Sequence, residues 1–401
     1  MKRIVLPALA VLAAVGWAPM LAAQDSVFVA SASGSNLLRL NNDAGLVVRG
    51  TAESGSIPAT GDGVRLMWHP GKYAIRAGQV ITEGLNGAGS FWDDVNVGAG
   101  SAAFGKNSRA SGDHSFAANL YTTASGDESV AFGNNGTASG DRAFAFNGTA
   151  SAVGAVAIGS GAQATNDDAL AMGPSSIAGG LAAIVLGPSI ANGNFGVAIG
   201  LQNSASGQFS VAIGKNARTA NRQGSVVLGD GCAGFSSDSV YPTANNQFVA
   251  RGCGGVKFFT NQALTSGVEL AAGGSGWSAV SDRNRKENFL AIDGEEILSR
   301  LRRVPVSSWN YRTQDGSIRH MGPMAQDFRA AFGLGESELM INSVDIDGVN
   351  MAAAQALDAR TAAQARRIEA LEASNADLRA QNAELRARLE RIEALLAAPK
   401  Q

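Results

Sequence analysis

The sequence predicts a mainly β protein in which a stacked β-solenoid precedes a small α+β domain and a C-terminal coiled coil. Three observations carry this prediction: a fourteen-residue motif recurs over residues 98–231, charged and helical patterns begin after Gly276, and the last helix has heptad spacing. The chain has 401 residues, enough for two or three domains, with 50 glycines and 16% charged residues. Because about a quarter of residues are usually charged, much of the chain should be turn-rich.

The N-terminus has the pattern of a secretory signal peptide. Basic residues precede an apolar run over residues 4–17, and small residues follow at Ala22 and Ala23. Pro7 interrupts this run, which is shorter than the roughly 20 apolar residues that span a bilayer. We assign residues 1–23 to a signal peptide. We expect an exported chain, extracellular, on the cell surface or periplasmic, with no transmembrane segment after cleavage.

Residues 24–97 are predicted to form a β cap domain, because polar and apolar residues alternate around glycine and proline, as in a hairpin. We interpret its aromatic residues, Trp68, Tyr73 and Trp92, as core. Stacking on a sugar is the alternative.

The repeat describes one coil of a solenoid. It reads SAAFGKNSRASGDH from Ser101, SFAANLYTTASGDE from Ser115 and SVAFGNNGTASGDR from Ser129. Small, apolar, Ala, apolar and Gly alternate with a period of two, which predicts a short strand with Val130 and Phe132 on the same side. The glycine after each strand and the ASGD segment supply two corners, so each repeat contains two strands and two corners.

A coil this thin buries few apolar side chains, so lateral association of several columns is expected, with a free-standing monomeric solenoid as the alternative. We interpret the repeated Asp113, Asp127 and Asp141 as turn residues rather than calcium ligands. The three histidines lie far apart, so we expect no metal and no cofactor.

The SVAIG and AVAIG segments and their corners resemble the head repeats of trimeric autotransporter adhesins over roughly residues 98–230. The resemblance implies a left-handed parallel β-roll built by three chains, and therefore a homotrimer. It implies no mode of anchoring, because residues 358–397 are too charged for the membrane barrel strands that end those adhesins. A host surface or polysaccharide is the open ligand class. Nucleic acid is not expected, because 32 basic residues are balanced by 34 acidic ones.

The chain has two cysteines. Cys232 is the first residue of a predicted β-rich connector at residues 232–277, and Cys253 lies within it. An exported chain meets an oxidising compartment, so we expect a disulfide within one chain or between chains. Free thiols are the alternative.

A new domain is predicted over residues 278–357, followed by a coiled coil over residues 358–397. The segments EEILSRLRRV, VPVSSWNYR and IRHMGPMAQDFRAAF are typical of a helix, a strand, and a turn followed by a helix. From Met351 the chain lacks glycine and proline until Pro399, which predicts a helix. Its heptad a positions are Ile368, Asn375, Asn382, Leu389 and Leu396, and its d positions are Leu371, Leu378, Leu385 and Ile392, which favours parallel association.

The segments SDRNRKENF, SWNY, HMGPMAQDF and VDIDGVN resemble the C-terminal intramolecular chaperone of endosialidases and other phage tail proteins, a self-cleaving peptidase family. The resemblance covers residues 281–357. It implies that three chains assemble and then cut themselves immediately before the serine. Carried over, Ser281 is the nucleophile, Lys286 the general base and Val280–Ser281 the scissile bond. Asp282 and His320 are candidate supporting residues on their residue types.

This chemistry is consistent with the residue types. A serine hydroxyl is a poor nucleophile unless a neighbouring base takes its proton, and lysine is such a base only when burial or nearby cations favour its neutral form. Arg283 and Arg285 are such cations. The alternative is structural: Ser-Asp caps a helix, Lys286 is a surface charge, and His320 belongs to a turn.

The predicted function is an exported homotrimeric fibre or adhesin-like surface protein whose chaperone domain drives assembly and autocleaves between Val280 and Ser281. It is an enzyme only as a single-turnover serine peptidase. One alternative is an uncleaved secreted scaffold with a permanent trimer clamp. The other, a polysaccharide-degrading tail-spike-like protein, is disfavoured because the head shows no paired carboxylates at a defined spacing.

Overall fold

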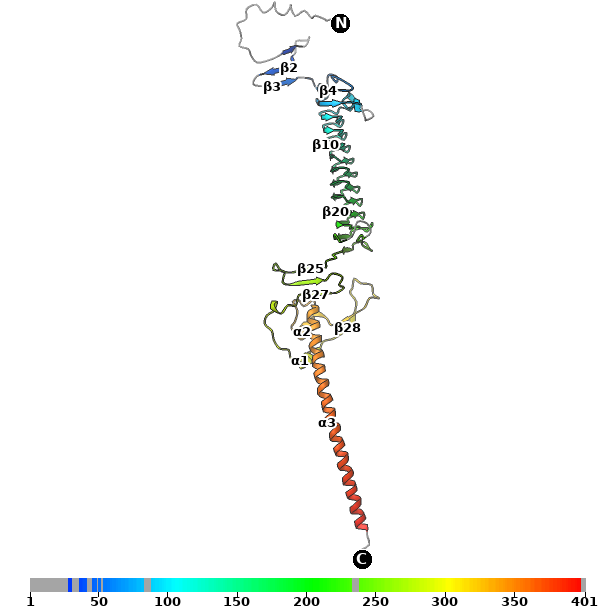
Figure 1. The fold of residues 1–401 in the computed structure, drawn as a ribbon, viewed down its shortest axis with the longest axis vertical. Helices are drawn as coiled ribbons and strands as arrows, with labels where there is room; N and C mark the ends of the chain where they lie inside the picture. The colour runs from blue at the N-terminus through cyan, green and yellow to red at the C-terminus, as the bar shows by residue number, and fades with distance from the viewer. Residues whose placement is uncertain are drawn as a thin grey trace, which may run out of the picture. The chain divides into compact units, whose positions relative to one another are not determined.

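The computed structural model shows a mainly β protein (Figure 1). Its chain divides into two compact units, Met1–Gly254 and Gly255–Gln401. The predicted signal peptide, residues 1–23, lies outside the described residues. The residues that the structure describes are 28–30, 36–41, 45–48, 50–51, 53–82, 88–232 and 238–397.

In the first unit, two parallel sheets wind into a β-solenoid, which confirms the prediction from the repeat. Strands of consecutive coils pair in register, so that Val130 lies between Phe116 and Phe144. The column can be followed from β4 through β10 to β20 in Figure 1. The larger sheet contains β4 (Gly63–His69), β5 (Ala74–Val80), β6 (Ala102–Lys106), β8 (Phe116–Leu120), β10 (Val130–Asn134), β12 (Phe144–Phe146), β14 (Val156–Ile158), β16 (Leu170–Met172), β18 (Ile184–Leu186), β20 (Val197–Leu201), β22 (Val211–Lys215), β23 (Val226–Gly229) and β24 (Phe248–Ala250).

Two further sheets belong to this unit. The smaller solenoid sheet contains β7 (Arg109–Ala110), β9 (Thr123–Ala124), β11 (Thr137–Ala138), β13 (Thr149–Ala150), β15 (Gln163–Ala164), β17 (Ile177–Ala178), β19 (Ile190–Ala191) and β21 (Ser204–Ala205). A separate antiparallel sheet contains β1 (Phe28–Ala30), β2 (Asn36–Asn41) and β3 (Gly45–Val48).

Alanine lines the interior of the solenoid. Ala117, Ala131 and Ala145 occupy the inward position of successive strands and have no exposed surface. The larger residues Val130 and Phe132 share one side of the strand, as predicted, but that side faces outward and is only half-buried. Since each coil encloses only two short strands, its interior holds little more than methyl groups at native packing density.

Aspartate side chains join consecutive coils at the ASGD corner. The Asp127 carboxylate accepts the backbone N–H of Asp113 at 2.9 Å, and the Asp141 carboxylate accepts that of Asp127 at 3.1 Å. The next residue in each corner, such as Glu128 or Arg142, has a positive φ of 58° or 59°. These aspartates therefore satisfy backbone donors at a turn.

The hairpin formed by β4 and β5 closes the N-terminal end, where β5 pairs with the first coil. The buried Arg76 guanidinium donates to the carbonyl and hydroxyl oxygens of Ser101 and to the Ala110 carbonyl. Burial lowers the pKa of Arg76 to about 10, so the side chain stays charged at neutral pH. Trp92 is fully buried and donates to the Ser108 carbonyl at 2.8 Å, so it is core rather than a sugar platform.

The second unit packs two short helices against a helix of 55 residues. The long helix begins at Ser343, earlier than the predicted Met351, because the Asn342 carboxamide accepts the Val344 N–H at 3.0 Å and caps it. No helix among the described residues has the length and apolar content needed to cross a membrane. The elements are β25 (Val256–Phe259), β26 (Gly267–Leu270), β27 (Trp277–Ala279), α1 (Gly294–Leu301), β28 (Ser307–Trp309), β29 (His320–Gly322), α2 (Ala325–Phe332) and α3 (Ser343–Ala397).

Candidate functional site

Ser281 and Lys286 are in direct contact. The Lys286 ammonium, Nζ, donates a hydrogen bond to Ser281 Oγ at 2.6 Å. The chain folds back between them through a single 3₁₀ turn, Arg283–Arg285. Asp282, rather than the serine, caps this turn by accepting the Asn284 N–H at 2.9 Å. The Ser281 hydroxyl is therefore left to the lysine.

The bond before Ser281 lies where a β-sheet ends. The Val280 N–H donates to the Gly267 carbonyl at 3.1 Å, which extends the pairing of β27 with β26 by one residue. At the end of the turn, Arg285 donates to the Thr265 carbonyl in the loop between β25 and β26 at 3.3 Å. Both sides of the Val280–Ser281 bond are thus held by the same meander of three antiparallel strands.

The pair is exposed to solvent in the single chain. Its nearest cations are engaged elsewhere: Arg285 lies 3.6 Å from the Asp282 carboxylate, and the Arg283 guanidinium lies 5.3 Å from the centre of the Phe289 ring. Because burial favours the neutral form of an amine, a shielded site would suit general-base chemistry better than an open one. In the single chain, Ser281 and Lys286 are therefore in contact with each other but exposed to water.

His320, a predicted supporting residue, belongs to an aromatic cluster in the hairpin of β28 and β29. Its Nε2 lies 2.9 Å from the Gln314 side-chain oxygen, and its ring centre lies 4.8 Å from that of Trp309 and 5.6 Å from that of Tyr311. Among the described residues, no hydrogen bond joins His320 to Ser281. Its contacts brace the hairpin.

Family comparisons match both regions singled out by the repeat and the Ser/Lys segment. Residues 281–333 match the family described as the chaperone of endosialidase. The YadA head domain repeat matches residues 97–118, 124–146, 150–176 and 191–217. This chain combines the two. No curated protein matches it. The resemblances drawn from the sequence are confirmed, and the YadA-type repeats indicate an adhesin-like surface protein.

Within these segments, the Ser281–Lys286 pair stands at the first residue of the endosialidase chaperone match. The YadA-type head carries the alanine-lined coils, with their larger apolar residues turned outward. The combination therefore places an adhesin-type head before a chaperone-type segment, with the contacting pair at the start of that segment.

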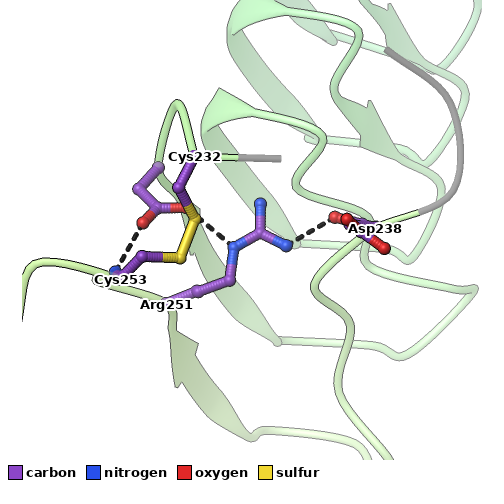
Figure 2. The surroundings of a disulfide bond; sticks show 5 residues. Cys232, Asp238, Arg251 and Cys253 are labelled. Carbon is purple, nitrogen blue, oxygen red and sulfur yellow. Dashed lines mark hydrogen bonds and ion pairs between the residues drawn. A yellow bond between two sulfur atoms is a disulfide. The ribbon is translucent and has the colours of Figure 1, made fainter. Parts of the chain in front are cut away.

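A disulfide joins Cys232 and Cys253 at the C-terminal end of the solenoid (Figure 2). Asp230 supports it: its carboxylate accepts the Cys253 N–H at 2.6 Å and Arg251 Nε at 2.7 Å. Arg251 also donates to the Asp238 carbonyl. The Cys253 amide, followed by Arg251, holds the pKa of the Asp230 carboxyl below its usual range. Sequence reasoning missed Asp230 and Arg251, since nothing in their spacing links them.

Asp230, Cys232 and Cys253 also form the one group of side chains among the described residues whose spacing fits a metal ion. Their two sulfur atoms are bonded to each other. A disulfide has no thiolate to offer a metal, so the oxidised chain uses this cluster as a covalent link.

Proposed function

We propose that this chain is an exported homotrimeric fibre of the adhesin type, whose C-terminal segment assembles it and then cleaves the bond between Val280 and Ser281. The observation that carries the proposal is the 2.6 Å contact between Lys286 Nζ and Ser281 Oγ, adjacent to that bond. A serine with a nitrogen base at hydrogen-bond distance is the arrangement that nucleophilic catalysis requires.

The chemistry balances with water as the only co-reactant. Ser281 Oγ attacks the Val280 carbonyl carbon while its proton passes to neutral Lys286. The bond from that carbon to the Ser281 nitrogen then breaks as the lysine returns the proton to the nitrogen. The resulting ester joins the Val280 acyl group to Ser281 Oγ. Water hydrolyses it, which leaves a carboxylate on Val280, a free amino group on Ser281 and the hydroxyl restored.

The outward face of the larger solenoid sheet supports assembly of several chains. Strands of successive coils place apolar residues in register along this face, and their exposed fractions reach 36–43%. Contiguous exposed apolar surface of this kind marks an interface in soluble proteins. The residues of this exposed series are Phe146, Met172, Ile184, Leu186 and Ile213.

The helix α3 supports the same conclusion. From Leu357 to Ala397 every residue of this helix is exposed, and the ion pair of Arg360 with Glu295 joins this part to α1. Its apolar a and d residues, from Ile368 to Leu396, are all exposed. A long helix with an uncovered heptad seam is stable in water when partner helices cover that seam. A parallel coiled coil of three chains would place the Ser281–Lys286 pair of each chain at the same height along the coil axis.

The deciding experiment is intact mass spectrometry of the wild-type chain and the Ser281→Ala variant, each expressed without residues 1–23. We expect the wild type to separate into fragments ending at Val280 and beginning at Ser281, while Ser281→Ala stays whole. Ser278→Ala, which removes an exposed hydroxyl from β27, is the control and should cleave normally. A wild type that stays full-length would instead make the C-terminal segment a permanent trimer clamp.

A further inference from the structure

Two exposed phenylalanines stack on each other at the ASGD-type corners of neighbouring coils. The ring centres of Phe195 and Phe209 lie 5.1 Å apart with an interplanar angle of 12°. The two residues are 43% and 52% exposed, so about half of their surface faces water. Both residues have positive φ, of 57° and 55°. This backbone conformation is unfavourable for bulky residues and suggests a functional reason for the rings.

The same corner position in other coils holds small, polar or charged residues. Backbone hydrogen bonds from this position to the coil before it align these residues in one column. The aromatic pair is therefore not a requirement of the corner. The column runs through His114, Glu128, Arg142, Gly154, Asp168, Ala182, Phe195, Phe209, Gly224 and Asn246.

The residues next to the pair in this column are small. On the far side of Phe209, the Asn246 carboxamide lies over Gly224, with its oxygen 2.1 Å from where a Cβ would stand. On the other side, Phe195 is next to Ala182, whose side chain is a single methyl group. The Asp168 carboxylate beyond it turns toward Gly154, 2.6 Å from the corresponding Cβ position. The outer face of Phe195 thus has no large neighbour in the column.

An amide residue precedes each of the two phenylalanines in the chain. Asn194 and Gln208 directly precede the two phenylalanines, and both are exposed. The Asn194 oxygen accepts the Leu181 N–H at 3.1 Å, which leaves its amino group as a donor. The Gln208 side chain has no hydrogen-bond partner among the described residues. The two amides and the two rings are all uncharged. Neutral hydrogen-bond donors and acceptors near a flat apolar surface suit an uncharged ligand with hydroxyl groups.

We propose that Phe195 and Phe209, with Asn194 and Gln208, form a carbohydrate-binding site that stacks a pyranose ring on the open face of Phe195. The apolar C–H face of the sugar would lie on the electron-rich ring face, and its hydroxyls would bond the two amides. The proposal deepens the proposed adhesive function by naming its ligand class. The two phenylalanines lie in the corners that precede β20 and β22, outside the strands whose apolar face is assigned to the other chains.

The test uses the full chain on a printed array of oligosaccharides with galactosyl, glucosyl and N-acetylhexosaminyl termini, followed by saturation-transfer NMR with the methyl glycosides of those sugars. We expect binding to weaken about tenfold or more in Phe195→Ser, as for loss of an aromatic anchor. Phe195→Tyr should retain binding. Ala182→Phe should abolish it, because a third ring would cover the open face.

Glu128→Ser is the matched control, since it changes the same corner position several coils away and should leave binding unchanged. The proposal is overturned if no sugar binds, or if Phe195→Ser binds as tightly as the wild type. It is also overturned if Phe195→Ser releases monomers in light scattering, because the rings would then contact another chain. These outcomes are separable from failure of the proposed function, which intact mass reports independently.

Discussion

Lys286 Nζ lies 2.6 Å from the hydroxyl oxygen of Ser281, five residues earlier in the chain. A 3₁₀ turn capped by Asp282 brings the two side chains together, and the end of the meander holds the adjoining peptide bond. The resemblance in sequence singled out this serine and this lysine, and the structure places their side chains at hydrogen-bond distance.

Replacing Lys286 with arginine should abolish cleavage while keeping the positive charge. A guanidinium is not deprotonated in proteins, so Lys286→Arg cannot accept the serine proton. Intact mass after expression reads the result. Lys257→Arg, in the exposed ion pair with Glu269, is the control and should cleave as the wild type does. Cleavage by Lys286→Arg would show that the lysine acts only through its charge.

A charge on the α3 seam should prevent assembly. Leu378 is 51% exposed at a d position, so Leu378→Asp would place a carboxylate between partner helices. We expect monomers by sedimentation. Leu395→Asp adds the same charge at a more exposed position off the seam and should leave the trimer intact. Equal effects of the two changes would argue against the heptad assignment.

Enlarging the solenoid interior should destabilise the head more than enlarging its surface. Ala131→Leu forces three extra carbons into a position with no exposed surface, at a cost of about 1–3 kcal/mol. Val130→Leu, one residue earlier on the outward face, should have a smaller effect. Thermal unfolding followed by circular dichroism compares the two, and a similar loss in both would contradict an alanine-lined core.

Removing the buried arginine should weaken the N-terminal end of the solenoid. Arg76→Met removes the charged donor from the Ser101 and Ala110 carbonyls, which keep only backbone N–H groups as partners, and this loss should cost about 1.5–3 kcal/mol. Hydrogen exchange of the first coil is the measurement. Arg142→Met removes an exposed arginine from a corner and should change exchange little. Unchanged protection in Arg76→Met would show that the cap does not depend on this residue.

The disulfide should stabilise the C-terminal end of the solenoid. It links Cys232 and Cys253 across a sequence separation of 21 residues, for which the loop-entropy relation gives about 3 kcal/mol. The double variant Cys232→Ser/Cys253→Ser should therefore expose the loop after β23 to limited proteolysis, as should reduction of the wild type. Reduction of the double variant is the control and should add nothing. Equal resistance of oxidised and reduced wild type would contradict this role.

The repeat predicted the strands and corners of the head because their spacing is local. Alternation identifies two faces of a strand, but it does not say which face is inside. Ala131 lies inside, and Val130 and Phe132 lie outside, because the second strand of the same coil leaves room only for a methyl group. The early start of α3 was missed because Asn342, a local cap, outweighs the helix-weakening Gly348.

The site was predictable in part. Resemblance singled out Ser281 and Lys286, and their contact follows from a turn that Asp282 caps. His320, grouped with them, contacts Gln314 and the rings of Trp309 and Tyr311, and its supporting role stays a prediction. Phe195 and Phe209 share one position of the repeat, fourteen residues apart, and this signal was available in the sequence.

By itself, the sequence determined the repeat, the change from glycine-rich to charged composition after Gly276, and the heptads. Each of these depends on residues close together along the chain. Only the tertiary structure decided which residues face inward, how Asp230 and Arg251 support the disulfide, and that the rings of Phe195 and Phe209 stack on each other. Those properties depend on the space left by neighbouring coils and on groups that folding brings together, neither of which local spacing specifies.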